Sequence, residues 1–382
     1  MKKHNYTVET FEAGRTEKGA GYSYFVPTLI NVEWTWQTPK LHTLLEKAST
    51  RLGELNAFAR LVPNVDLFIH LHLVKEAVVS SRIEGTRTNM DEALMPEGEI
   101  AADRLADWLE VVNYTTALNT AIDELGVLPL SSRLLRQAHH TLLQSVRGSN
   151  KQSGEFRRSQ NWIGGLTIAD AIFIPPAHSY VEELMGDLEN FLHNADIDVP
   201  DLIRIGIAHY QFETIHPFLD GNGRIGRLMI PLYLVSRGVL HKPLLYPSVF
   251  FEQDRNLYYD NLMRVRKQND LLHWLQYFLV GIEATATKAV STLEELLALK
   301  TALEEQLHGA MGKRSGNALL LLTYLFEQPF NSIKEVSERL SISPKSANEL
   351  VSKFVALGIL EEISGQSRNR LFVFRRYIQL FS

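Results

Sequence analysis

Apolar positions recur every three or four residues over most of the chain from Leu41 onward, and this spacing predicts helices. Strand-like alternation of apolar and polar residues is rare in the same region. The pattern therefore predicts a mainly α protein, with helices over residues 41–60, 64–84, 104–123, 131–146, 180–193, 201–215, 224–237, 256–267 and 270–308. Residues 1 to about 40 lack this period, are rich in glycine, threonine and aromatic residues, and are predicted to be irregular.

Two short segments interrupt the helical pattern and predict a small β-hairpin. The segments NWIGG (161–165) and AIFIPP (171–176) have the composition of extended chain. Their glycines favour a turn between them, and the proline pair ends the second segment.

The C-terminal part of the chain has a different character. SIKEVSERLSISPKSANELVSKFVALGIL predicts helix, turn and helix, and EEISGQSRNRLFVF predicts two short strands around a polar turn. This order is typical of a winged helix, which serves DNA binding in some proteins and dimerisation or regulation in others. The second helix carries Lys345 and Lys353 against Glu349, the turn adds Arg368 and Arg370, and Arg375 and Arg376 follow. Phosphate binding needs clustered positive charge, so DNA is an alternative partner rather than the first expectation.

These patterns divide the chain into three predicted parts: an N-terminal helical region over 1–100, a helical core with the hairpin over 101–300, and a winged-helix-like α+β domain over 301–382. The long helical stretch 270–308 has room for an interface, so a homodimer is a further expectation.

The composition excludes several classes of function. The 382 residues are 45% hydrophobic and 22% charged, which is ordinary for a globular protein. The absence of cysteine excludes disulfides, thiol catalysis and cysteine-ligated zinc, and the net charge of −5 gives no general attraction to nucleic acid. The N-terminus has no signal-peptide pattern and no window holds about 18 uninterrupted apolar residues, so a cytoplasmic protein without a membrane span is expected.

Most of the candidate catalytic and binding residues lie in the segment HPFLDGNGRIGR, residues 216–227. Pro217 disfavours helical geometry at His216, so this histidine is expected at the end of a helix. The glycines let backbone N–H groups approach a ligand, and these groups open the next helix, where the helix dipole favours anions. A phosphate-binding loop is predicted, and it is not a Walker A loop because no GxxxxGK[ST] sequence occurs.

The charged side chains of this stretch fit the same chemistry. The carboxylate of Asp220 can bind Mg²⁺, with phosphates completing its shell. Arg224 and Arg227 can neutralise phosphate charge in forked geometry. Positive charge beside His216 disfavours its protonated form, and a neutral imidazole can act as a general base. Each of these residues alone is common in turns or at helix ends. Their combination within twelve residues favours a functional site.

The complete string resembles the signature of the Fic family, HxFx[DE]GNGRxxR, without a departure at any position. The matching residues are His216, Phe218, Asp220, Gly221, Asn222, Gly223, Arg224 and Arg227. The resemblance implies a Fic-type helical core with a small β-hairpin flap. It also implies an enzyme, a protein adenylyltransferase that transfers AMP from ATP to hydroxyl groups of target proteins and of itself.

The resemblance assigns a role to each part of the string. His216 would deprotonate a serine, threonine or tyrosine hydroxyl of the target, Phe218 would be buried and anchor the loop, and Asp220 would bind Mg²⁺. Backbone N–H groups would hold the α-phosphate and its neighbour, Asn222 would also orient the nucleotide, and the arginines would bind the outer phosphates. The nucleotide- and phosphate-binding segment would comprise Gly221, Asn222, Gly223, Arg224, Ile225, Gly226 and Arg227.

Two further segments fit this family. The segment ADAIFIPP resembles the flap, whose extended backbone could pair with a target segment by strand addition, while Ile172 and Phe173 cover the nucleotide. A plain structural hairpin is compatible with that role. The segment RNLYYDNL resembles the adenine contact, with Tyr258 as the contacting residue, although paired tyrosines on a helix usually serve packing.

The segment SSRIEGT, residues 80–86, resembles the Fic inhibitory motif [ST]xxxE[GN] through Ser80, Glu84 and Gly85. Glu84 is expected at the C-terminus of a helix, where the dipole disfavours negative charge and favours a cationic partner. From local sequence alone this is a solvated glutamate. The resemblance implies instead that Glu84 pairs with Arg227, occupies the γ-phosphate site and keeps the enzyme inactive.

Two alternatives to an autoinhibited AMP transferase remain open at this point. A Fic-type enzyme could use another phosphate-containing donor or remove AMP, with Glu84 positioning water. The chain could also be a DNA-binding regulator that senses nucleotide, although sensing alone needs no His216.

Overall fold

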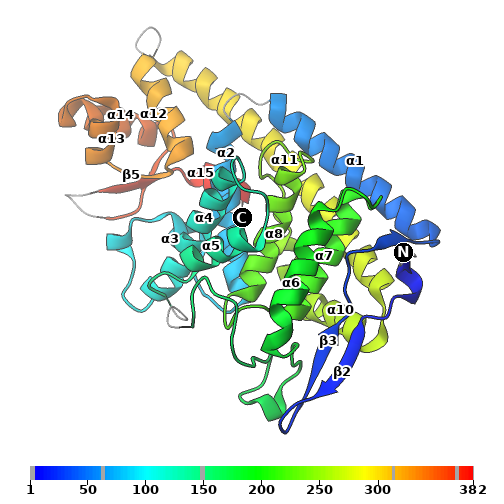
Figure 1. Cartoon of the computed structure of the whole chain (residues 1–382). Helices are drawn as coiled ribbons and strands as arrows, with labels where there is room; N and C mark the ends of the chain where they lie inside the picture. The colour runs from blue at the N-terminus through cyan, green and yellow to red at the C-terminus, as the bar shows by residue number, and fades with distance from the viewer. Residues whose placement is uncertain (1–4, 62–64, 147–150, 312–314, 366–369, 382) are drawn as a thin grey trace.

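The computed structural model describes residues 5–61, 65–146, 151–311, 315–365 and 370–381, and its architecture is mainly helical (Figure 1). The helices up to residue 311 are α1 (Pro39–Leu61), α2 (Val65–Ile83), α3 (Met90–Leu94), α4 (Leu105–Glu124), α5 (Ser132–Leu142), α6 (Val181–His193), α7 (Asp201–Ile215), α8 (Asn222–Ser236), α9 (Ser248–Gln253), α10 (Arg255–Gln268) and α11 (Leu271–Met311). Every predicted helix is present. The largest difference is at α5, which ends at Leu142 rather than at residue 146, and Ser145 beyond this end has a positive φ of 56° that a continued helix would not allow.

The centre of the molecule is α7, in which every residue from Leu202 to Ile215 is buried. The indole of Trp274 in α11 donates a hydrogen bond to the carbonyl oxygen of Gly206 at 2.9 Å. A Cβ at Gly206 would lie 3.0 Å from the side chains of Leu275 and Phe278, so α7 and α11 pack closely only because this residue is glycine. The end of α7, where the predicted catalytic histidine lies, therefore extends from a rigid core.

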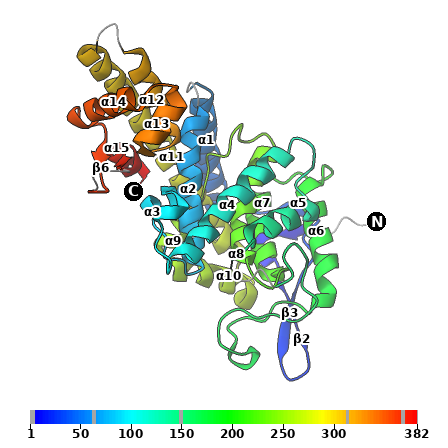
Figure 2. The same cartoon turned by 90° about the vertical axis from the view of Figure 1, so that its left-hand side faces the viewer.

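The remaining long helices surround this centre. The first helix, α1, runs along the outside of α11 (Figure 1). The second, α2, packs on α4, α8 and α9 in the middle of the molecule (Figure 2). Its C-terminal end is followed by Glu84 and by Gly85, whose φ of +104° is unfavourable for other residues. This packing brings residues 80–86, the segment that resembles the inhibitory motif, to the start of α8.

The prediction that residues 1–40 are irregular is wrong. They form β1 (Asn5–Thr7), β2 (Gly14–Lys18), β3 (Ser23–Pro27) and β4 (Glu33–Thr35). Strands β1 and β4 are parallel, and β2 and β3 form an antiparallel hairpin. Each strand has at most five residues, too few for alternation to stand out, and the β1–β4 pairing is between segments far apart in sequence.

The predicted hairpin at 161–165 and 171–176 forms with a single antiparallel bridge, between Ile163 and Phe173. The carboxylate of Asp170 accepts the N–H groups of Leu166 and Thr167 at 2.8 and 2.7 Å and thereby fixes the turn. The hairpin is tied to the N-terminal strands by the N–H of Phe25, which donates to the carbonyl oxygen of Ile174 at 3.0 Å. We call residues 161–176 the flap.

The C-terminal part has the predicted order of elements. It comprises α12 (Gly316–Glu327), β5 (Phe330–Ser332), α13 (Ile333–Leu340), α14 (Pro344–Ala356), β6 (Glu361–Glu362), β7 (Leu371–Val373) and α15 (Arg375–Ile378). Strand β5 is added to the two predicted strands, which gives the antiparallel order β5-β7-β6.

Several basic side chains of this part pair with carboxylates within the protein, and Arg368 lies outside the described residues. Arg375 pairs with Asp91 of α3 at 2.5 Å, and Arg370 pairs with Glu362 at 3.4 Å. These ion pairs reduce the positive charge free for phosphates, and DNA binding by this part stays a prediction. Within the described residues, none of the helices combines the length and the apolar character that a membrane span needs.

Candidate active site

His216 lies directly after the last turn of α7 and adopts the left-handed conformation, with φ of 50° and ψ of 61°. This conformation is unfavourable by about 1 kcal/mol for a residue with a Cβ, so neighbours must hold it. Its carbonyl oxygen accepts hydrogen bonds from Arg157 Nε at 3.0 Å and from Asn161 Nδ2 at 3.1 Å. The predicted helix end at His216 is confirmed, and the contacts of Arg157 and Asn161 fix its backbone, whereas its Nδ1 atom is buried without a hydrogen-bond partner among the described residues.

Burial lowers the pKa of His216 to about 3, and the charges of Arg266 and Arg157 act in the same direction. The nearby carboxylate of Glu84 opposes them. The sequence predicts a neutral imidazole because of Arg224 and Arg227. In the structure, burial is the main cause, and the arginines that add to it lie outside residues 216–227. A neutral imidazole at physiological pH is the form that can accept a proton.

The loop after His216 is held by buried contacts. Phe218 is fully buried, as predicted, and stacks on His139 with ring centroids 3.8 Å apart. The Asn222 amide accepts the Phe218 N–H and donates to the Phe218 carbonyl oxygen, both at 2.8 Å. The Asn222 side chain thus shapes the loop, and the prediction that Asn222 also orients the nucleotide stays a prediction.

The N-terminus of α8 has the form of an anion site. Gly221 is the N-cap with φ of 73°, and no side chain caps the helix. The first N–H groups of a helix have no acceptor within the helix. Those of Asn222 and Gly223 therefore point out of the N-terminus of α8, where a ligand could accept them. A Cβ at Gly223 would collide with the carboxylate of Glu84. The anion found at this helix end is therefore Glu84 itself.

Ile225 and Gly226, the other predicted members of the phosphate-binding segment, serve packing. Ile225 is fully buried. The carbonyl oxygen of Gly226 is 2.9 Å from His209 Nδ1, and a Cβ on Gly226 would collide with the carboxylate of Glu213. Neither residue lines the cavity around His216, and glycine is needed at position 226 for the close approach of Glu213.

Arg227 joins the inhibitory segment to α8. Its guanidinium is fully buried and donates to Ser80 Oγ and to the Ser80 carbonyl oxygen, both at 2.9 Å, and to Glu84 Oε1 at 2.6 Å. The expected pair between Glu84 and Arg227 is thus present. Burial would raise the pKa of Glu84, but the charge and hydrogen bond of Arg227 outweigh it and lower that pKa. The carboxylate is therefore ionised, with a third of its side chain still exposed to the cavity.

Arg227 also keeps one donor unused. Its Nη1 atom is buried and has no hydrogen-bond partner among the described residues. A Cβ on Gly223 would lie 2.9 Å from this atom, which places the free donor beside the N-terminus of α8. An anion at this helix end could receive both the helix N–H groups and the Arg227 donor.

Arg224 is buried and pairs with Glu110 of α4 at 2.9 Å, with side-chain exposures of 4% and 5%. Its other contact is the Asp220 carboxylate at 3.9 Å. The Glu110 partner could not be seen in the sequence, and it means that Arg224 also ties α8 to α4. Its guanidinium is close to the loop but is not freely available for phosphates.

Glu110→Ala is expected to lower the free energy of unfolding by about 3–5 kcal/mol, because it leaves the buried Arg224 guanidinium with only a distant carboxylate. Urea denaturation of the variant and of Glu110→Gln, which keeps an acceptor, checks this. The free energy of unfolding should fall less in Glu110→Gln than in Glu110→Ala. Equal stability of the wild type and both variants would contradict a buried ion pair.

Asp220 has the donor set expected for a hard cation. Its Oδ2 lies 3.2 Å from Lys151 Nζ, its Oδ1 accepts the Gly221 N–H at 2.7 Å, and a third of the side chain is exposed. A single carboxylate at an open edge fits Mg²⁺ that takes its other ligands from phosphates and water. The Lys151 ammonium already lies at this carboxylate, so a positive charge is accommodated at the predicted position.

A cavity of about 480 Å³ is lined by some of these groups, whereas Asp220, Arg224 and Arg227 are not among its lining residues. His216, Glu84, Glu213 and Gly223 line one part of it, and Ile172 and Phe173 of the flap line another, as predicted for both flap residues. Such a volume is typical of a small-molecule site. The cavity therefore brings the base, the anion site and the flap together.

The placement predicted for Tyr258 is wrong. Tyr258 is fully buried, and its hydroxyl is 2.9 Å from His209 Nε2. The neighbouring Tyr259 lines the cavity instead. Arg266, which sequence reasoning missed, also lines it, with its guanidinium 4.0 Å from the ring centre of Phe173. No local pattern marks Arg266, because it reaches the site only through the packing of α10 on α7.

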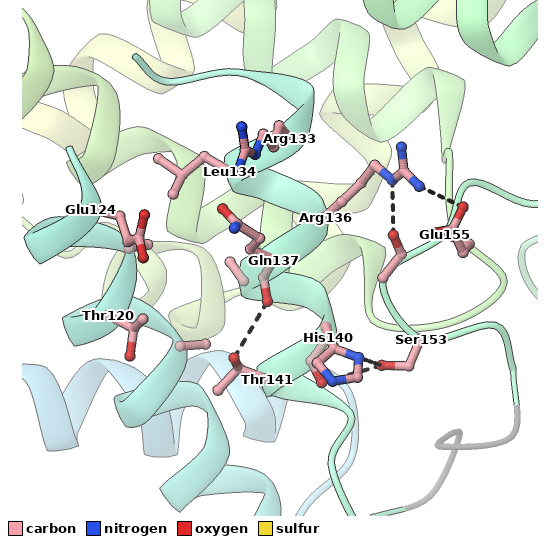
Figure 3. A pocket seen from close by; sticks show the side chains of 14 residues that line it. Thr120, Glu124, Arg133, Leu134, Arg136, Gln137, His140, Thr141, Ser153 and Glu155 are labelled. Carbon is pink, nitrogen blue, oxygen red and sulfur yellow. Dashed lines mark hydrogen bonds and ion pairs between the residues drawn. The ribbon is translucent and has the colours of Figure 1, made fainter. Parts of the chain in front are cut away.

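A larger hollow of about 550 Å³ between α4 and α5 is a less suitable site (Figure 3). Arg136 there pairs with Glu155 at 2.5 Å and donates through Nε to the Gly154 carbonyl oxygen at 2.9 Å. Ser153 bonds to the His140 carbonyl oxygen at 3.2 Å. These polar groups bond to one another, and none of the predicted site residues lines this hollow.

Comparison with known proteins identifies two matching family models, described as Fic/DOC family N-terminal for residues 42–123 and Fic/DOC family for residues 129–234. A protein adenylyltransferase Fic from Culex quinquefasciatus is 33% identical over 43% of this chain, and one from Drosophila grimshawi is 26% identical over 67%. The matches span only 30% and 50% of those two proteins.

Solved structures show the same fold. A Fic family protein from Desulfovibrio desulfuricans aligns over 88% of this chain and 96% of its own, with a TM-score of 0.57 and 22% identity. A Fic domain containing signaling protein from Bacteroides thetaiotaomicron aligns over 66% of this chain and 95% of its own, with a TM-score of 0.51 and 20% identity.

Proposed function

We propose that this chain, which belongs to the Fic/DOC family, transfers AMP from ATP to hydroxyl groups of target proteins and of itself, and that Glu84 keeps it inactive. One observation carries the proposal. The Glu84 carboxylate lies against Gly223 at the N-terminus of α8 and pairs with Arg227, in the same cavity as His216. An anion site beside a neutral imidazole is what phosphoryl chemistry requires, and here the protein fills that site with its own anion.

His216 accepts the proton of the attacking hydroxyl in this proposal. Its pKa of about 3 keeps it neutral at physiological pH, and the contacts of Arg157 and Asn161 to its carbonyl oxygen hold it in place. The N–H groups that open α8 and the free Nη1 of Arg227 stabilise phosphate oxygens as charge develops. The hydroxyl oxygen bonds to the α-phosphorus, the bond to the β-phosphate oxygen breaks, and pyrophosphate leaves.

Asp220 is the residue that would hold Mg²⁺. The ion would supply charge neutralisation at the phosphates when bound. Lys151 would have to leave the Asp220 carboxylate, and its half-exposed side chain can swing into solvent.

The inhibitory part of the proposal follows from charge. A carboxylate at the N-terminus of α8 repels the phosphate that would bind there, and it also occupies the Arg227 donor at 2.6 Å. The Ser80 contacts hold the guanidinium in place even when the carboxylate is absent. Removing Glu84 should therefore open the site without dismantling it.

The position of the transferred label tests the reaction. The Glu84→Gly variant is incubated with ATP labelled at either the α- or the γ-phosphate, with Mg²⁺ and cell lysate, and proteins are separated on a denaturing gel. Retention of the α label alone is expected. Retention of the γ label would indicate phosphoryl transfer instead. No protein label from either nucleotide, with ATP binding shown separately, would contradict transfer from ATP.

A further inference from the structure

A second cavity, of about 170 Å³, lies between α2, α11 and the last described residues of the chain. Its lining includes His72, Lys75, Glu76, Tyr246, Lys288 and Phe381. Glu76 precedes Ser80 by one turn of α2, so the cavity shares a helix with the residues that hold Arg227. The active-site cavity has a different lining.

Polar atoms inside this cavity lack partners. His72 Nε2, Glu76 Oε2 and the Tyr246 hydroxyl are buried without a hydrogen bond to any described residue, and the exposed fractions of these residues are 9%, 0% and 4%. Glu76 Oε1, by contrast, accepts hydrogen bonds from the hydroxyls of Tyr114 at 3.1 Å and Ser248 at 2.5 Å. Buried polar groups are almost always paired, so three unpaired atoms around one space indicate an occupant with polar groups.

The walls between these atoms are apolar. Leu244, Val249, Phe250 and Phe381 contribute them, and the Phe381 ring packs edge-on against His72 with centroids 4.8 Å apart. An apolar cavity of about 150 Å³ is sufficient to bind benzene. The space therefore fits one six-membered ring, with polar groups at its edge.

Two lysines give the cavity a positive side. Lys75 and Lys288 both line it, and within the described chain no carboxylate lies within ion-pair distance of either ammonium group. Burial lowers the pKa of Lys75, and the charge of Lys288 lowers it further, which shows that the two ammonium groups disfavour each other. Burial also raises the pKa of Glu76, which disfavours the charged form of this carboxyl. An anion between the lysines would relieve the repulsion.

We propose that this cavity binds a small aromatic acid with a ring hydroxyl. The carboxylate of the ligand pairs with Lys75 and Lys288, and its hydroxyl bonds with the unpaired atoms of His72, Glu76 and Tyr246. A hydroxyl group donates one hydrogen bond and can also accept, so it can serve both an acceptor and a donor among these three atoms.

Isothermal titration calorimetry with 4-hydroxybenzoate, in the absence of nucleotide, tests the proposal. Saturable binding to the whole chain with one site is expected, together with a rise in Tm. Tyr246→Phe removes only a hydroxyl and should weaken binding about tenfold, and Lys75→Met should do the same. Lys47→Met, at an exposed position of α1, is the matched control and should bind as the wild type does. Benzoate and phenol, which each lack one polar group, should bind more weakly.

Two results would overturn the proposal. One is the absence of saturable binding to wild type at millimolar 4-hydroxybenzoate, which would mean that the cavity holds ordered water only. The other is binding that neither Tyr246→Phe nor Lys75→Met weakens, with circular dichroism showing that both variants are folded. Because no nucleotide is present, either result is independent of whether the chain transfers AMP.

Discussion

Glu84→Gly is expected to raise the rate of AMP transfer by about 100-fold. The substitution frees the buried Arg227 guanidinium, now bonded to Glu84 at 2.6 Å, for a phosphate oxygen. A hydrogen bond to a charged group contributes about 1.5–3 kcal/mol, which corresponds to roughly 10- to 100-fold. Loss of the negative charge at the N-terminus of α8 acts in the same direction. The measurement is incorporation of α-labelled nucleotide into protein by wild type and variant under the same conditions.

Two further variants test whether the charge of Glu84 or the volume of its side chain inhibits transfer. Glu84→Gln keeps the shape and one acceptor but removes the charge, so it should give an intermediate rate. Glu99→Gly replaces an exposed glutamate elsewhere and should leave the rate at the wild-type level. ATP should raise the Tm of Glu84→Gly more than that of wild type, because the variant has a buried Arg227 in need of an anion. Equal rates for Glu84→Gly and wild type would remove the basis for inhibition by Glu84.

Local sequence determines the features of this protein that could be predicted. The helix end at His216 follows from Pro217, the buried Phe218 belongs to an eight-position signature, and the apolar period locates the long helices. The Glu84–Arg227 pair was predicted only because a family resemblance linked two distant segments, since a glutamate at a helix end is ordinarily solvated. The division of the chain at residues 100 and 300 stays a prediction.

Tertiary contacts determine the features that could not be predicted. Glu110 lies far from the signature in sequence and becomes the partner of Arg224 only where α4 packs on α8. Arg266 likewise reaches the cavity from α10. The choice between Tyr258 and Tyr259 depends on the rotation of α10, which His209 fixes by its contact with the Tyr258 hydroxyl. A helical period gives the face of a helix to within about one residue, and that is too coarse to separate adjacent tyrosines.

His216→Ala in the Glu84→Gly protein is expected to lower AMP transfer by about 10²–10⁴-fold, the usual contribution of a general base. His140→Ala is the matched control, since His140 is an exposed histidine outside the active-site cavity, and it should leave the rate unchanged. Both variants should keep the Tm shift that ATP produces, because His216 is not among the groups that bind phosphate in this proposal. Loss of the ATP-induced shift in His216→Ala would mean that the residue acts in binding rather than in proton transfer.

The protonation state of His216 shows which role it has. A neutral imidazole can act as a general base, whereas a protonated one could act only as a positive charge. With a pKa of about 3, its imidazole should stay neutral from about pH 8 to about pH 5, whereas an ordinary histidine with a pKa of about 6.5 would become mostly protonated. The pKa of His216 is lowered first by burial and second by the charges of Arg266 and Arg157, because all three destabilise the protonated imidazole. NMR of the ring carbons, assigned by the signal missing in His216→Ala, should show no titration of this residue in that range. A titration near pH 6.5 would mean that the cation forms readily, and the rate should then fall in acid as the proton acceptor is lost.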